Sequence, residues 1–189
     1  MAFTNVKVAN LALLRLKQDT IQNWDEDTTQ GALAATAWEL ARLPALELGN
    51  WTFATKYVSL SYNTGAEPPD FAYEFDLPAD FVRVAEVMPS QRHQPIEFKR
   101  RGQKLYSDTT PLPLFYIYDH DNPGEWSPLF CSVMAWRLAG EMATSLQDAA
   151  QDRDQCMRYA FAESQAARAA DAANTYTDLP DGNHWNDAR

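Results

Sequence analysis

The sequence is poor in the residues that most often carry chemistry or cross-links. It has two cysteines and three histidines in 189 residues. Cys131 and Cys156 fall on predicted helices, and no cysteine–histidine pattern has the spacing of a zinc site. We therefore expect both thiols to be small apolar core residues in a reducing compartment, and we expect no bound metal.

Basic residues are also scarce. The chain has 16 lysines and arginines against 26 acidic residues, which gives a formal net charge of -10. Proteins that grip phosphates need clustered basic side chains. The only basic cluster is Lys99-Arg100-Arg101, with Lys104 close by, and we interpret it as a solvated hairpin tip rather than a DNA contact. A negatively charged surface beside DNA would repel the duplex, so that DNA could move through a passage without binding to its wall.

Long apolar runs are missing as well. No segment approaches the roughly 18 apolar residues that a membrane span needs. The residues from Met1 to Lys7 contain no apolar signal region. We expect a protein that is made and kept in a cytosol, with no membrane contact.

Catalytic patterns are not recognisable. There is no GxGxxG or phosphate-binding loop. His93, His120 and His184 are scattered, and nothing places one of them beside a nucleophile. If Asp119-His-Asp-Asn122 is extended, its successive side chains point in opposite directions. We therefore interpret it as a polar loop rather than a shared metal site. We expect no catalytic residue and no cofactor, although among 26 acidic residues some carboxylate pair can reach a hydrolase-like separation by chance.

Helical periodicity is present at both ends of the sequence. It predicts helices from Asn5 to Lys17, capped by Thr4 or Asn5, and from Thr28 or Thr29 to Leu48. Pro44 should kink the second helix or end its regular part, and Gly49 suits the residue after its end. The predicted apolar positions of these two helices are Val6, Ala9, Leu13, Leu16, Leu33, Ala37, Leu40 and Ala41.

Two more helices are predicted downstream. Ser127 as cap and Pro128 as first residue predict the start of one, with Trp126 packing onto its first turn near Cys131. The other should run from Asp148 to Asn174. Its predicted stripe is Cys156, Tyr159 or Ala160, Glu163, Ala167 and Ala170.

Between the helix pairs the period changes to two, which predicts short strands. The expected strands are Thr55–Tyr62, Phe71–Phe75, Phe81–Val87, Pro95–Phe98 and Leu114–Tyr118. Frequent prolines favour antiparallel pairing in a small β-sandwich or barrel-like sheet. The predicted fold class is α+β, mainly α. A four-helix bundle-like body (1–50 and 126–174) carries an inserted β-rich subdomain (51–125) and an extended C-terminal tail (175–189).

The tail has no periodicity but contains large apolar side chains. A tryptophan in such a segment calls for something to cover it. The candidate partner-binding residues are Tyr176, Leu179, Trp185 and Arg189. Trp185 is either an anchor in a partner's pocket or part of a tail folded back on its own subunit, and the sequence leaves both open.

Six motifs follow one another in a recognisable order. They are Ala9-Asn-Leu-Ala-Leu13, Arg42 and Leu46 before Trp51-Thr-Phe-Ala54, Tyr73 to Val84, Tyr116 to Tyr118, Trp126 to Phe130 with Arg137-Leu-Ala139, and Tyr159 to Asp171. Together, from about Val8 to Asp171, they resemble the head-to-tail adaptor of short-tailed bacteriophages, the tail tubular protein A family. Pro44 departs from the pattern expected there.

The resemblance implies a structural virion protein that is assembled in the host cytoplasm. It implies a ring of twelve subunits under the portal protein, with the tail nozzle (tail tubular protein B) below and viral DNA passing through the lumen. The helices would form the ring body, and Thr175 to Arg189 is the segment that reaches the portal in relatives. Two alternatives stay open: a virion-associated peptidoglycan or polysaccharide hydrolase, and a cellular adaptor.

Overall fold

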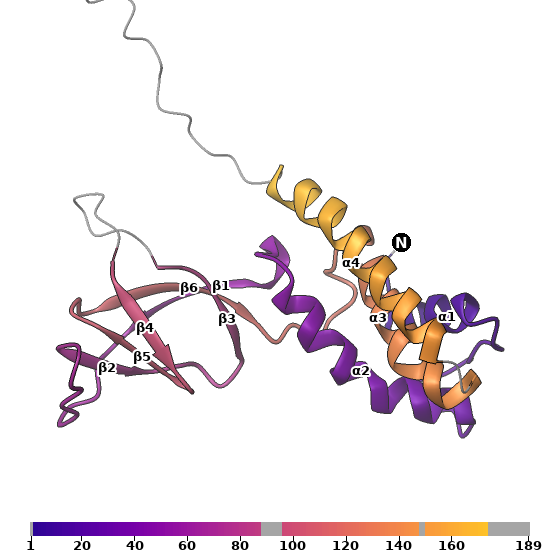
Figure 1. Ribbon diagram of the computed structural model, residues 1–189, viewed down its shortest axis with the longest axis horizontal. Helices are drawn as coiled ribbons and strands as arrows, with labels where there is room; N and C mark the ends of the chain where they lie inside the picture. Colours follow the sequence, from indigo (N-terminus) through magenta and orange to yellow (C-terminus); the bar gives the residue numbers. More distant parts are fainter. Residues whose placement is uncertain (1, 88–95, 148–149, 174–189) are drawn as a thin grey trace, which may run out of the picture.

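The computed structural model describes residues 2–87, 96–147 and 150–173 (Figure 1). Four helices, α1 (Asn5–Arg15), α2 (Thr29–Glu47), α3 (Pro128–Gln147) and α4 (Ala150–Ala172), lie at one end and are called the helical body. The strands between α2 and α3, from Thr55 to Tyr118, lie at the other end and are called the β-lobe. The predicted mixed α+β class is confirmed, including the antiparallel insertion between two helix pairs.

Three helix starts are fixed by side-chain caps, of which Thr4 and Ser127 were predicted as caps and Thr28 only as a possible start. The Thr4 hydroxyl accepts the Lys7 N–H at 3.3 Å, and the Thr28 hydroxyl accepts the Gly31 N–H at 3.1 Å. Ser127 accepts the N–H of Phe130 at 3.2 Å. Each bond satisfies one of the amides that a helix leaves unpaired at its start. The chain geometry at these three points was therefore readable from the sequence.

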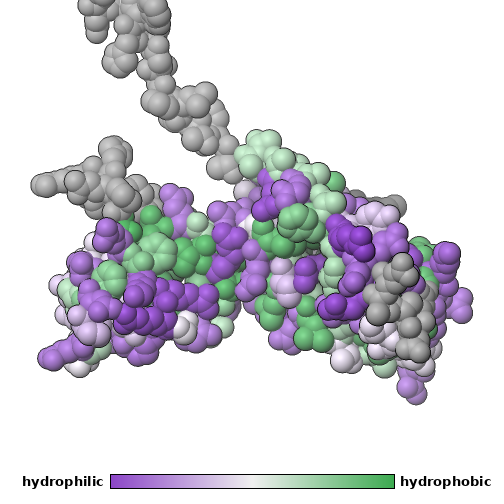
Figure 2. All heavy atoms as spheres, in the orientation of Figure 1, coloured by the Kyte–Doolittle hydropathy of each residue, from purple (hydrophilic) through white to green (hydrophobic). Residues whose placement is uncertain are grey.

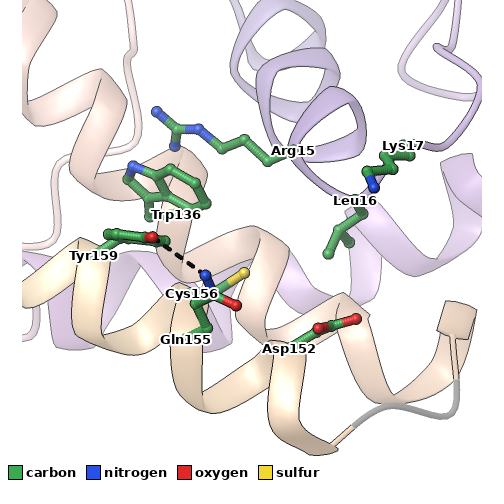
Figure 3. Close-up of a pocket in the computed structure, with 8 residues that line it drawn as sticks. All are labelled: Arg15, Leu16, Lys17, Trp136, Asp152, Gln155, Cys156 and Tyr159. Atoms are coloured by element: carbon green, nitrogen blue, oxygen red, sulfur yellow. Dashed lines mark hydrogen bonds between the residues drawn. The ribbon is translucent and has the colours of Figure 1, made fainter.

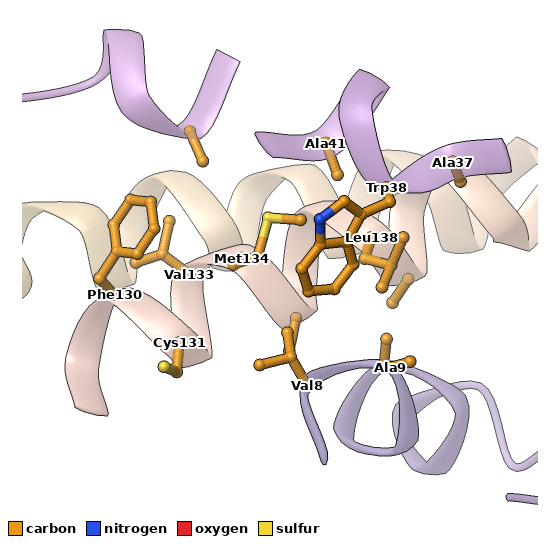
Figure 4. Close-up of a cluster of buried hydrophobic side chains, with 14 of the residues drawn as sticks. Val8, Ala9, Ala37, Trp38, Ala41, Phe130, Cys131, Val133, Met134 and Leu138 are labelled. Carbon is orange, nitrogen blue, oxygen red and sulfur yellow. The ribbon is translucent and has the colours of Figure 1, made fainter. Parts of the chain in front are cut away.

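Helix α3 is the centre of the helical body. The other three helices each pack against it, and Figure 4 shows side chains of α1, α2 and α3 meeting in one cluster. Trp126 is buried there, with its ring 5.8 Å from that of Trp38 and 5.1 Å from that of Phe130. Trp126 thus packs onto the first turn of α3, as predicted. Whether the four helices form a bundle stays a prediction.

One apolar position of α2 was predicted wrongly. Leu40 is 60% exposed. The buried apolar stripe is instead Ala34, Ala37, Trp38, Ala41, Ala45 and Leu46. That stripe places Leu40 on the solvent side of a helix with 3.6 residues per turn. Its helical spacing from Leu33 and Ala37 had suggested burial.

Pro44 does not end α2, which continues to Glu47. The last turn is held by the buried side chains of Ala45 and Leu46. It is also held by the Trp51 indole, which is fully buried and donates to the Ala45 carbonyl oxygen at 3.2 Å. These contacts offset the helical hydrogen bond that proline cannot make.

Helix α4 faces α3 through small side chains. The buried positions are Cys156, Ala160, Ser164, Ala167 and Asp171, so the predicted Glu163 and Ala170 are off the buried stripe. On α3, Gly140 lies against Met157, and a Cβ there would be 2.7 Å from the Met157 Cε atom. Small residues on both helices let their backbones approach closely.

The β-lobe contains two antiparallel sheets of three strands. The first has the order β1 (Thr55–Leu60), β6 (Leu112–Tyr118), β3 (Phe81–Val87), and the second β2 (Tyr73–Asp76), β5 (Lys104–Ser107), β4 (Phe98–Arg101). A 3-10 turn, η1 (Thr52–Ala54), leads into β1. Both sheets contribute to one core: Leu60, Phe75, Leu105, Leu112, Leu114 and Tyr116.

The β4–β5 hairpin was predicted incorrectly. Strand β4 begins at Phe98, where the predicted strand was to end, and β5 was not expected. The basic triplet lies on β4, and the turn after it is formed by Gly102 with a φ of 60°. All four side chains of β4 are exposed, so no alternation of apolar residues marks it as a strand.

Candidate interaction surface

An ion pair joins α2 to the segment that leaves the β-lobe. Arg42 is 7% exposed, and its Nε and Nη2 atoms lie 2.8 and 2.9 Å from the two carboxylate oxygens of Asp119. Arg42 also pairs with Asp121, which accepts the Trp38 indole N–H at 2.9 Å. Two-point contacts of this kind are among the stronger polar interactions. They fix the exit of the β-lobe against α2.

His120 lies between these aspartates and is buried. Its Nδ1 atom is 2.7 Å from the Tyr118 hydroxyl, and its Nε2 atom is 3.3 Å from a Glu125 carboxylate oxygen. Burial lowers the pKa of His120, which favours the neutral imidazole near neutral pH. The sequence had suggested a plain polar loop here, whereas this segment is built into the junction of the two lobes.

Metal chemistry is not indicated at this segment. In the ranges that the structure describes, no group of three or more histidine, cysteine, aspartate or glutamate residues could hold a metal ion. Asp119 and Asp121 are instead the partners of Arg42. Sequence reasoning missed Arg42 because it and Asp119 are 77 residues apart. A buried arginine in an Ala-rich helix was the one available signal.

A second connection ties the end of α4 to the entrance of the β-lobe. Asp171 accepts the backbone N–H and the hydroxyl of Thr52, each at 2.8 Å. Arg168 donates to the Leu48 carbonyl oxygen at 3.1 Å. A Cβ on Gly49 would lie 2.8 Å from the Arg168 Cγ atom. Gly49 follows the C-cap of α2, as predicted, and its lack of a side chain admits the arginine.

A cavity of about 640 Å³ lies where α4 ends beside the first sheet, and it is called the junction cavity. Its lining residues are Asn50, Thr52, Thr55, Ala85, Glu86, Phe115 and Ala172. A second cavity of about 290 Å³ shares Asn50 and Ala172 with it. The junction between the lobes is therefore concave beside the end of α4.

Aromatic side chains are exposed on both elements that meet at the junction cavity. On β1, Tyr57 is 55% exposed and pairs across the strands with Phe115, with 5.1 Å between ring centres. On α4, Tyr159 is 45% exposed and Phe161 57% exposed. In Figure 2, apolar residues are visible on the surface of both lobes. Tyr57 packs on the lining residue Phe115, whereas Tyr159 and Phe161 lie eleven or more residues before Ala172 on α4. An exposed aromatic ring beside a concavity, such as Tyr57, is typical of an interaction site.

Two of the three basic side chains of strand β4 share one acidic neighbour in the β-lobe, and Arg100 lies over the Phe81 ring. Arg101 pairs with Asp70, and Lys99 lies 3.9 Å from the same carboxylate. Lys104, on β5, pairs with Glu74. The pKa of Lys104 is raised mainly by this hydrogen-bonded partner. The triplet is exposed, as predicted, but it lies on strand β4 rather than at the hairpin tip, which Gly102 forms.

A further pocket of about 330 Å³ lies among α1, α3 and α4 (Figure 3). Arg15 stacks over Trp136, with 3.9 Å from the guanidinium carbon to the ring centre, and donates to Ser132 at 2.8 and 2.6 Å. The Trp136 N–H donates to Glu163 at 2.8 Å. Burial lowers the pKa of Arg15. Arg15 and Trp136 are thus bound to residues of α3 and α4, and Gln155 donates to the Tyr159 hydroxyl at 3.2 Å, so these side chains serve packing among the three helices.

Both cysteines are free and buried, which confirms their prediction as core residues. Burial raises the pKa of the Cys131 thiol to about 12. The same cause raises the pKa of Cys156. Thiols of this kind stay protonated near neutral pH and are poor nucleophiles.

The predicted partner-binding residues, Tyr176, Leu179, Trp185 and Arg189, lie outside the described residues. No helix in the described ranges is both long and apolar enough to cross a membrane. The sequence matches no protein-family model and no curated protein. The interpretation of this surface therefore rests on the residues themselves and on the motif order given above.

Proposed function

We propose that this chain is the head-to-tail adaptor of a short-tailed phage, a virion protein that is assembled in the host cytoplasm. In this proposal twelve copies form a ring, with a bundle-like helical body, between the portal protein and the tail nozzle. The observation that carries it is a two-lobed chain whose lobes are tied together by part-buried polar contacts and expose apolar side chains. Such a subunit suits assembly more than catalysis.

The tied lobes support the proposal because a connector has to hold a fixed geometry. Arg42 fixes the exit of the β-lobe, and Asp171 fixes its entrance. Arg42 and Asp171 are buried, although their partners are half-buried or exposed, so these contacts are part-buried and less open to water than surface ion pairs. Two separate attachments restrict rotation of one lobe against the other.

The charge of the chain supports a passage for DNA without specific binding. The net charge is -10, and Lys99, Arg101 and Lys104 of the basic cluster lie against acidic residues of the same chain. A lumen built from such subunits would repel the phosphate backbone and let the duplex slide. The C-terminal residues Tyr176, Leu179, Trp185 and Arg189 remain our proposed portal anchors.

The proposal is tested by the mass of the purified protein in solution, alone and mixed with the portal ring of its phage. We expect a large defined oligomer, formed either alone or on the portal. A monomer that ignores the portal would refute the adaptor. The same preparation, incubated with cell-wall polymer, should release no sugar. Release of sugar that a mock purification lacks would favour the hydrolase.

The tail anchor has its own test. A chain truncated before Thr175 retains all four helices and both sheets that the structure describes. We expect it to bind the portal more weakly than the full chain. Normal portal binding by the truncated chain would remove the anchor from the proposal and leave the ring.

A further inference from the structure

The C-terminal half of α4 presents an unusual surface. From Tyr159 to Ala173, which the structure describes throughout, none of the exposed side chains is charged. They are Tyr159, Phe161, Ala162, Gln165, Ala166, Ala169, Ala170, Ala172 and Ala173, and they are called the α4 face. The preceding turns expose Arg153, Asp154 and Arg158. Solvated helix faces usually carry charged residues along their whole length.

Three ionic residues in this half of α4, Glu163, Arg168 and Asp171, bind inward, and Asp171 accepts the two bonds from Thr52 described above. Glu163 accepts the Trp136 indole N–H at 2.8 Å. Arg168 donates to the Leu48 carbonyl oxygen at 3.1 Å and to the Ser164 carbonyl oxygen at 3.3 Å. Their charged groups are therefore engaged with the subunit's own helices. The α4 face therefore carries only apolar or uncharged polar side chains over roughly 20 Å of helix.

The α4 face is continuous with a concavity. Ala172 belongs to the face and also lines the junction cavity. On the other side of that cavity lies Phe115, against which the exposed Tyr57 ring packs. A partner seated on the α4 face could place one apolar side chain into this cavity. In Figure 2, a pale green strip of residues follows the visible end of α4 down toward the gap between the lobes.

We infer that the α4 face, together with the junction cavity, is where a second copy of this chain packs. The inference rests on the proposed ring and names its subunit contact. The net charge of -10 supports this occupant, because copies that repel each other can approach closely only where charge is missing. Exposed alanines let the backbone of a neighbouring element come near, and the Phe161 ring, which is 57% exposed, supplies apolar contact area.

The test places one charge in the centre of the face. Ala166→Glu and Ala166→Lys change an exposed residue to good helix formers, so each variant should fold. Ala35→Glu makes the same change at an exposed alanine of α2 and is the matched control. Circular dichroism verifies the helix content of all three. Light scattering over a dilution series gives the concentration at which half of the protein is assembled, alone and on the portal ring.

We expect both Ala166 variants to raise that concentration by at least about a hundredfold. Ala35→Glu should behave like the unmodified chain. Loss of assembly in both the glutamate and the lysine variant would show that burial of a charge, rather than the change in net charge, prevents the subunits from packing. If Ala166→Glu assembled at the same concentration as the unmodified chain, the proposed subunit contact would be overturned, while the adaptor proposal would stand. An unmodified chain that assembles through this face yet never binds portal would overturn the adaptor alone, and one that stays monomeric would overturn both.

Discussion

The carboxylate of Asp171 holds Thr52 at two points, the backbone N–H and the hydroxyl, each 2.8 Å away. This contact joins the last turn of α4 to the turn that enters the β-lobe, 119 residues earlier in the chain. Replacement by alanine should remove both bonds, and the donors of the exposed Thr52 would then bind water instead. We expect Asp171→Ala to lower the free energy of unfolding by about 2 kcal/mol, measured by urea denaturation. Asp171→Asn keeps one acceptor and should lose less; equal losses would contradict this account.

Two helical glycines should respond oppositely to alanine. A Cβ on Gly31 would lie 2.5 Å from the Glu26 backbone oxygen, which cannot move aside easily. A Cβ on Gly140 would meet the Met157 Cε atom, the far end of a flexible side chain. We expect Gly31→Ala to cost about 2 kcal/mol and Gly140→Ala to cost little, because alanine favours helix and Met157 can turn away. Thermal unfolding of the two variants side by side tests this, and the reverse ranking would contradict it.

Alkaline pH should weaken the β-lobe through Tyr116. Burial, together with the hydrogen bond to Asp80, raises the pKa of Tyr116 to about 12 from its ordinary value of 10.0. The folded chain thus holds this proton more tightly than the unfolded chain. The resulting stability is complete below pH 10 and is lost as the pH rises toward 12. Denaturant unfolding at about pH 8 and about pH 11 should show a smaller loss for Tyr116→Phe than for the unmodified chain.

The native thiols should resist modification. Cys131 is fully buried, and its pKa of about 12 keeps it protonated at neutral pH. We expect a thiol-specific reagent to label the folded protein slowly and to label both cysteines quickly after denaturation. A Cys131→Ser variant serves to assign the rate to each position. Rapid labelling of Cys131 in the folded chain would show that the core around it opens.

Local signals predicted the ends of the elements well. Thr4, Thr28 and Ser127 cap helices because a side-chain oxygen can accept the N–H of the residue three positions ahead. The two partners are so close in sequence that a short stretch of residues is enough to recognise them. Strand Phe81–Val87 was predicted with its observed bounds, since apolar residues and a preceding Pro-Ala-Asp turn mark it. The Leu40 error shows the limit, because the spacing of apolar residues does not specify which side of a helix is covered.

The junction could not be predicted because its contacts join distant parts of the chain. Arg42 meets Asp119 only after α2 and β6 are placed, and Asp171 meets Thr52 only after α4 has packed on α3. The uncharged surface of α4 was visible as an alanine-rich stretch, which predicted close packing against a neighbour. The structure shows that many of those alanines face outward instead.

The insertion of the β-lobe by two chain crossings has a mechanical consequence. The chain enters it at Trp51 and leaves it after Tyr118, and each crossing is anchored to a different helix of the body, one to α4 and one to α2. A force applied to the β-lobe is therefore shared between these two contacts. It reaches α3 through α2 and through α4, because both helices pack on α3. A displacement of the β-lobe is therefore transmitted to the whole helical body rather than taken up by rotation at a single connection.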